Sequence, residues 1–181
     1  MKRTSVAAIS IVAVLLAVLV GVLGSIALAA QDRFTLKVPN GLAFAEFRGY
    51  ETWQNVAVSQ TEKGLKIIAA NPVMMEAYRQ GLPAKGKKFP DGSKIVKIEW
   101  YSVKNRESPY FVMVPGALKS VSFIEKNSKR FPDTNGWAYA QFRYDAASDS
   151  FTPHGTGAKC GYACHTAVAA KDYIFTAYPK R

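Results

Sequence analysis

The residues with the clearest chemical potential in this chain are Cys160, Cys164 and His165, which stand in the stretch CGYACH near its C-terminal end. The chain has two cysteines and both lie here, and one of its two histidines directly follows the second cysteine. The usual signal for attachment of a c-type haem is C-x-x-C-H, and CGYACH differs from it by one extra residue between the cysteines. The stretch is therefore a candidate haem site with an altered spacing.

Three interpretations of this stretch are open on spacing alone. A disulfide would join Cys160 to Cys164, but the Cβ atoms of residues four apart on a helix run side by side, which suits the bond poorly. A zinc ion would need a fourth ligand, and Cys164 and His165 point about 100° apart on a helix, which makes binding one ion with both awkward. In a haem site this divergence helps, because the cysteines bond the porphyrin edge while His165 turns toward the iron. The spacing favours one covalently attached haem c.

The second axial position of such an iron has no evident protein ligand. The other histidine, His154, falls in a predicted loop. Met74 and Met75 are expected to pack in a helix and Met113 in a strand, since methionine commonly fills protein cores. None of these residues stands in a motif that predicts ligation, so the sequence favours an iron that is open on one side.

Residues 1–29 have the pattern of a secretory signal peptide. Lys2 and Arg3 precede an uncharged apolar run over residues 6–23, and Ala27-Leu-Ala29 is an A-x-A cleavage pattern. An uncleaved membrane anchor is the alternative, because about 18 apolar residues can span a bilayer. The sequence therefore predicts export to the periplasm, with cleavage after Ala29.

Residues 30–181 are expected to form one domain, since their number suits a single hydrophobic core. The formal net charge of the whole chain is +11, and its isoelectric point near 9.7 is of the kind found in nucleic-acid-binding proteins. Export and the scatter of the lysines argue against a nucleic acid as partner. A positive surface instead favours acidic partners or anionic lipid headgroups.

The elements that must position these residues are predicted to be an antiparallel sheet and a few short helices, an α+β fold class. In residues 136–144 (GWAYAQFRY), for example, Trp137, Tyr139 and Gln141 alternate with small or apolar residues, as on a strand with two different faces. The predicted strands cover residues 53–60, 65–70, 94–103, 110–114, 118–125 and 136–144, and the helices cover 40–49, 71–81 and, for haem attachment, 160–171; residues 145–159 are expected to be loop.

Three segments, in their order and spacing, resemble the cytochrome P-460 family. They are residues 89–99 (FPDGSKIVKIE), residues 128–137 (from SKRF to GW) and residues 160–176 (from the first cysteine to a final IFT). The resemblance implies an exported homodimer with an antiparallel sheet and one covalent haem c. It also implies thioether bonds from both cysteines, His165 as the iron ligand and a lysine, Lys97, bonded covalently to the haem ring.

The resemblance further implies an activity, the oxidation of hydroxylamine or a related small nitrogen compound, with electrons passed to an acceptor cytochrome. Lys97 would then be the catalytic residue. Two alternatives stay open. One is a non-catalytic haem protein that binds nitric oxide or carbon monoxide, like the sheet-rich cytochromes c′; the other is a plain electron carrier with a sixth iron ligand. The presence of Lys97 favours the enzyme.

The residues alone would assign Lys97 no special role, because a lysine that alternates with Ile95 and Glu99 on a strand is usually solvated. Lys94 is the next candidate for the bond to the ring, but it is predicted on the opposite face of the strand. Glu99, Asp149 and His154 are weak candidates for a distal acid or base.

Overall fold

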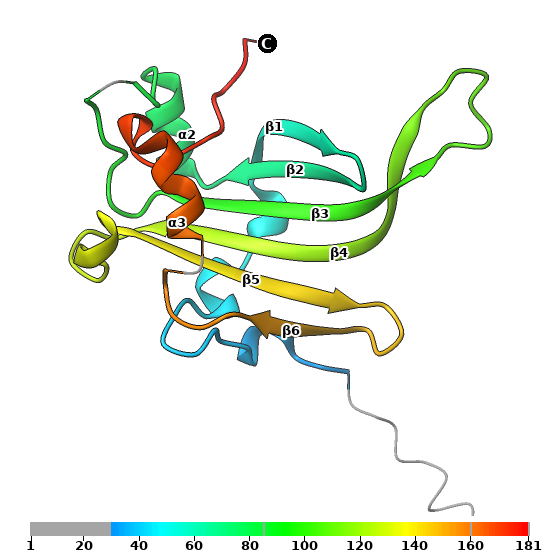
Figure 1. Cartoon of the computed structure of the whole chain (residues 1–181), viewed down its shortest axis with the longest axis horizontal. Coiled ribbons are helices and arrows are strands. Elements are labelled where there is room, and N and C mark those ends of the chain that lie inside the picture. The colour runs from blue at the N-terminus through cyan, green and yellow to red at the C-terminus, as the bar shows by residue number, and fades with distance from the viewer. Residues whose placement is uncertain (1–29, 85, 160, 181) are drawn as a thin grey trace, which may run out of the picture. The chain divides into compact units, whose positions relative to one another are not determined.

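The structure is a computed structural model that describes residues 30–84, 86–159 and 161–180 (Figure 1). The expected signal peptide at 1–29 and Cys160 lie outside these residues. From Gln31 onward the chain forms one compact unit. Within the described ranges no helix has the length and the apolar character needed to cross a membrane.

A six-stranded antiparallel sheet dominates the fold, which confirms the predicted α+β class. Each strand pairs with the next along the chain, so the order in the sheet is the order in the sequence. Alternating apolar and polar residues suit strands of this kind, because side chains on a strand point to opposite faces. The strands are β1 (Gln54–Thr61), β2 (Gly64–Ala70), β3 (Lys94–Lys104), β4 (Met113–Lys126), β5 (Trp137–Asp145) and β6 (Ser150–His154).

One face of the sheet, called here the packed face, is covered by the N-terminal segments of the described chain. Three short 3-10 helices, at Arg33–Thr35, Phe44–Phe47 and Tyr50–Thr52, replace the helix predicted over 40–49. Phe44 sits at the centre of an aromatic cluster, with ring centroids 5.0 Å from Phe123 and 4.9 Å from Phe142. This cluster is the main hydrophobic core.

The opposite face, called here the cavity face, is covered at one end by α2 (Pro72–Arg79), by α3 (Tyr162–His165) and by the C-terminal segment. Asn71 caps α2 as predicted, because its side-chain oxygen accepts a hydrogen bond from Met74 N at 3.1 Å. Met74 and Met75 belong to this helix and are buried in a second cluster with residues of the sheet. The remainder of the face is where a cavity opens.

Two further predictions about the elements are wrong. Pro115 and Gly116 do not separate two strands, because β4 runs through them and the pairing with β3 shifts there instead, as proline allows at a bulge. Ser150–His154 forms β6 at the sheet edge, where a loop was expected. The helix predicted over 160–171 is confirmed over residues 162–171, where α3 is followed by a 3-10 helix, Thr166–Lys171, with a kink at Val168.

Candidate functional site

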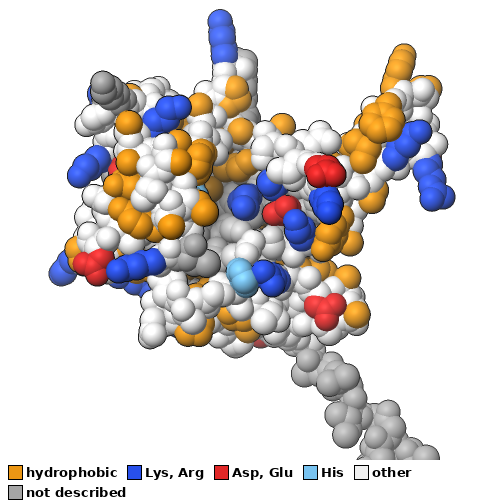
Figure 2. Space-filling model, in the orientation of Figure 1, with side chains coloured by type: hydrophobic (Ala, Val, Ile, Leu, Met, Phe, Trp, Pro, Cys, Tyr) orange, Lys and Arg blue, Asp and Glu red, His pale blue; other side chains and the backbone are white. Residues whose placement is uncertain are grey.

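A cavity of about 550 Å³ lies between the cavity face of the sheet, α3 and the C-terminal segment of the chain. Its lining includes Lys97 from β3, Cys164 and His165 from α3, and Phe175. In Figure 2 the face carries a hollow with hydrophobic side chains on one side and Lys or Arg side chains on the other. The volume lies in the range of small-molecule and cofactor sites. Residues more than 60 positions apart in the sequence thus meet at one site.

The position of α3 depends on Gly161. A Cβ atom at this residue would come 2.8 Å from Cδ1 of Tyr139 on β5, which is closer than real Cβ contacts. The glycine therefore lets the start of α3 pack directly on the sheet. His165 then lies against two rings, with centroids 4.6 Å from that of Tyr139 and 4.9 Å from that of Phe175.

The imidazole of His165 is prepared as a metal ligand. Its Nδ1 lies 2.6 Å from the carbonyl oxygen of Tyr173. Because a carbonyl can only accept, Nδ1 carries the proton, and Nε2 is left with its lone pair. Burial lowers the pKa of His165, and the positive charge of Lys97 lowers it further, although the Tyr173 carbonyl opposes them. The neutral form that binds metals is favoured.

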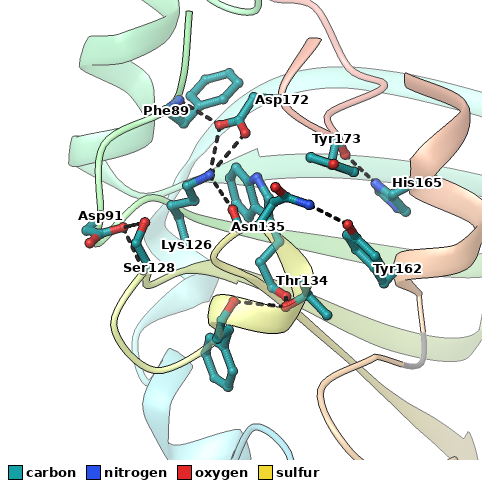
Figure 3. Close-up of polar contacts among 12 residues, drawn as sticks. Phe89, Asp91, Lys126, Ser128, Thr134, Asn135, Tyr162, His165, Asp172 and Tyr173 are labelled. Atoms are coloured by element: carbon teal, nitrogen blue, oxygen red, sulfur yellow. Dashed lines mark hydrogen bonds and ion pairs between the residues drawn. The ribbon is translucent and has the colours of Figure 1, made fainter. Parts of the chain in front are cut away.

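Behind this hydrogen bond lies a buried ion pair (Figure 3). Lys126 Nζ is 3.0 Å and 3.1 Å from the two carboxylate oxygens of Asp172, and it also donates to the carbonyl of Asn135 at 2.8 Å. Asp172 accepts a further hydrogen bond from Phe89 N at 2.8 Å. Asp172 immediately precedes Tyr173, so the pair fixes the chain that carries the acceptor of the His165 proton.

Lys97 stands in the middle of β3 on the cavity face, with Ile68 of β2 and Ser122 of β4 as its neighbours across the sheet. It is half-buried, and burial lowers the pKa of its ammonium group; two neighbouring lysines lower it further, while the carboxylate of Glu99 acts against them. A lowered pKa increases the share of neutral amine, which is the nucleophilic form of lysine. The face assignment from the sequence is confirmed, since Glu99 shares this face.

The weak distal candidates are not among the cavity-lining residues of the described chain. Glu99 is buried and bound to Lys119 at 2.9 Å, and Lys66 lies 3.9 Å from the same oxygen. His154 Nε2 is 3.1 Å from a guanidinium nitrogen on β5, and Asp149 accepts a hydrogen bond from a tyrosine hydroxyl at 2.7 Å. Neutral polar residues that do line the cavity include Ser59, Ser122, Gln141 and Thr176.

The other candidate ligands lie elsewhere as well. Met74, Met75 and Met113 do not line the cavity, and Lys94 points to the packed face, where it donates to the carbonyl of Glu46 at 2.8 Å. Among residues 30–84, 86–159 and 161–180, no cluster of three or more His, Cys, Asp or Glu could hold a metal ion alone. The zinc interpretation therefore finds no further ligand there. The choice between disulfide and thioether bonds depends on Cys160, outside the described residues.

The residues present fit a haem c. The cavity offers a thiol at Cys164, a neutral imidazole whose Nε2 keeps its lone pair, and an amine at Lys97, beside apolar walls from Ile68, Ile95 and Phe175. A porphyrin needs this mixture, with an axial nitrogen for the iron and apolar surface for the ring. The cavity could thus receive the cofactor that CGYACH predicts.

Sequence reasoning did not find the residues behind His165. The segment from Asp172 to Thr176 contributed to the family resemblance, but nothing in it assigned a role to Asp172 or to the carbonyl of Tyr173. Lys126 carried no signal, because it continues a strand whose other residues alternate in the ordinary way. Tyr139 was predicted on the same side of a strand as Trp137 and Gln141, but it was not recognised as the support for α3.

A known protein family matches most of the chain. The family model described as cytochrome P460 matches residues 47–176, which is most of the chain and includes Lys97, both cysteines and His165. No curated protein matches the chain significantly.

Proposed function

Because this chain belongs to the cytochrome P460 family, and so to the haem proteins, we propose that it oxidises hydroxylamine or a related small nitrogen compound. We propose one haem c, held by thioether bonds from Cys160 and Cys164, with His165 as the only protein ligand of the iron and Lys97 bonded to the ring. The electrons would pass to an acceptor cytochrome.

One observation carries the proposal: Lys97, Cys164 and His165 line the same cavity. Lys97 comes from the centre of the sheet and the other two from α3, so the fold is what brings them together. Lys94, three residues earlier in the same strand, faces away from the cavity. Lys97 is therefore the lysine of this strand that can reach a ring bound through α3.

The haem would supply an iron with an open coordination position and the capacity to accept electrons one at a time. The chain's own residues bind and orient. His165 lines the cavity with an imidazole whose Nε2 keeps its lone pair, while Ser122 and Gln141 offer a hydroxyl and an amide that can hydrogen-bond a small molecule containing N and O. Each electron taken from hydroxylamine is accompanied by one proton, which must leave the cavity for solvent.

The test is the spectrum of Lys97→Leu, made with the haem c maturation machinery. In the wild type, a bond from Lys97 to the ring should move the spectrum well to the red of an ordinary c-type haem. The variant should have the ordinary spectrum with its haem still attached. Hydroxylamine turnover should fall about 100-fold, the scale of effect seen when a reacting group is misplaced, and hydroxylamine binding should fall much less.

Lys104→Leu is the matched control, because Lys104 is an exposed lysine at the end of the same strand, outside the cavity. Its spectrum and turnover should be those of the wild type. A wild-type spectrum of the ordinary kind, unchanged in Lys97→Leu, would contradict the proposal and leave an electron carrier. Tight binding of nitric oxide or carbon monoxide without turnover would instead indicate a gas-binding protein.

Two further expectations are part of the proposal. Export predicts a mature N-terminus at Ala30, which N-terminal sequencing of the periplasmic protein would find. A homodimer is supported by the outer ends of β3 and β4 with the loop between them, an arm that exposes large apolar side chains (Figures 1 and 2). Tyr110 and Phe111 are 77% and 78% exposed there. Sedimentation should give a dimer that Phe111→Asp weakens.

A further inference from the structure

We propose that the Lys126–Asp172 ion pair is a positioning device for the haem ligand, which sets the reduction potential of the iron through the Tyr173–His165 hydrogen bond. The inference rests on the proposed haem site. It assigns a role to two residues that do not line the cavity and that would touch neither haem nor substrate.

The pair is almost completely buried, and each of its charged groups has further hydrogen-bond partners. The side chains of Lys126 and Asp172 are 2% and 3% exposed. The ammonium group reaches both carboxylate oxygens and the Asn135 carbonyl, and it lies 4.8 Å from the ring centroid of Trp137. The carboxylate also holds Phe89 N. So many partners leave Asp172 a single position.

The backbone at this point adopts a conformation that needs such support. Two consecutive residues, Asp172 and Tyr173, have positive backbone φ angles, +50° and +64°. Residues other than glycine seldom occupy this left-handed region. Strained conformations of this kind persist only where the surroundings determine them strongly. These two left-handed residues direct the carbonyl oxygen of Tyr173 toward Nδ1 of His165, which lies 2.6 Å away. The ion pair thus holds the strained turn that aims the acceptor.

Stability alone is a weak explanation for the pair, since a buried ion pair can often be replaced by apolar residues without loss of stability. The hydrogen bond it supports has a chemical consequence. A strong acceptor at Nδ1 makes the imidazole a more basic ligand, and a more basic ligand stabilises the ferric form of the iron. Without the pair, the Tyr173 carbonyl should drift, the hydrogen bond weaken and the potential rise.

The experiment compares the haem-loaded wild type with Asp172→Asn and with the double variant Lys126→Met/Asp172→Asn. The readouts are the reduction potential, the iron–histidine stretching frequency of the ferrous protein and the denaturant midpoint. The single variant leaves a buried cation unpaired, so its midpoint should fall. The double variant removes both charges, so its midpoint should return toward that of the wild type.

In both variants the potential should shift to more positive values and the stretching frequency should fall. The matched control is Glu46→Gln/Arg130→Met, which removes an ion pair on the packed face, away from His165. Its potential and frequency should be those of the wild type. Asp172→Glu, which keeps the charge, should restore part of both shifts.

A double variant with both a wild-type midpoint and a wild-type frequency and potential would overturn the positioning role. If the double variant does not fold, an unchanged frequency in Asp172→Asn overturns it equally. Failure of the haem proposal looks different, because the wild type itself would then carry no haem in a denaturing gel, and both inferences would fall together.

Discussion

The two faces of the sheet differ in how they hold charge. On the packed face two cations meet two carboxylates: Lys94 and Arg130 lie 4.0 Å and 3.8 Å from Glu125, and Arg130 also pairs with Glu46. Charge that is withdrawn from water must be paired, and here it is balanced. This face is covered by the chain's own N-terminal segments, and its charges suit a face that is closed to solvent.

The cavity face has a surplus of positive charge around Lys97. Lys66 and Lys119 both approach the single carboxylate of Glu99, and together they lower the pKa of Lys97. Such an imbalance would be costly under a closed core, but here it lies beside an open cavity. The difference indicates that one face serves folding and that the other is shaped to receive a group from outside the chain.

The largest effect should come from Phe44→Ala on the packed face. Phe44 is fully buried among aromatic rings, and removing such a side chain typically costs about 3–5 kcal/mol of unfolding free energy. Because the ring lies away from the cavity, the haem spectrum of the folded protein should not change. Denaturant titration and the optical spectrum measure the two effects. Val58→Thr, at a side chain of β1 that is 77% exposed, should change stability by no more than about 0.5 kcal/mol. A shifted haem spectrum in Phe44→Ala would contradict the conclusion that the packed face acts on folding and not on the haem site.

Gly161→Ala should have a smaller cost in stability and a clear effect on the cavity. The new methyl group would press on the ring of Tyr139, and overpacking of this kind usually costs about 1–3 kcal/mol. Since α3 must move outward, the haem spectrum should change together with the denaturant midpoint. In a Tyr139→Ala background the methyl group has room, so Gly161→Ala should add little. Equal costs in both backgrounds would show that α3 does not rest on Tyr139.

The sequence predicted the sheet well because its strands alternate, and alternation is a local signal. It failed at Pro115, a residue type that usually ends a strand, because a shift in the pairing with β3 lets β4 continue through it. It also failed at β6, because this edge strand is too short to show a clear alternation. It placed Lys97 and His165 in one site only through a family resemblance. The Lys126–Asp172 pair joins residues 46 apart and follows no local pattern, so only the folded chain reveals it.

The smallest expected effect concerns the balance of charge on the packed face. Burial raises the pKa of Glu125, with Lys94 acting against it and Glu46 adding to it, and its Oε2 accepts no hydrogen bond within the described ranges. An acid with a raised pKa in the folded state contributes stability at low pH and loses it as the pH rises through that pKa. Glu125→Gln cannot ionise, so the variant should not lose this stability as the pH rises.

Relative to the wild type, Glu125→Gln should therefore become more stable as the pH rises from about 4 to 7, by at most about 1 kcal/mol. Glu46 is the matched control, because despite its burial the hydrogen bond from Arg130 helps to lower its pKa. The stability that Glu46 contributes is therefore present at pH 7 and lost as the pH falls. Relative to the wild type, Glu46→Gln should become less stable as the pH rises from about 4 to 7. Denaturant midpoints at the two pH values measure both trends. Parallel trends in the two variants would mean that the packed face does not hold its charges as a balanced set, and the contrast with the cavity face would then disappear.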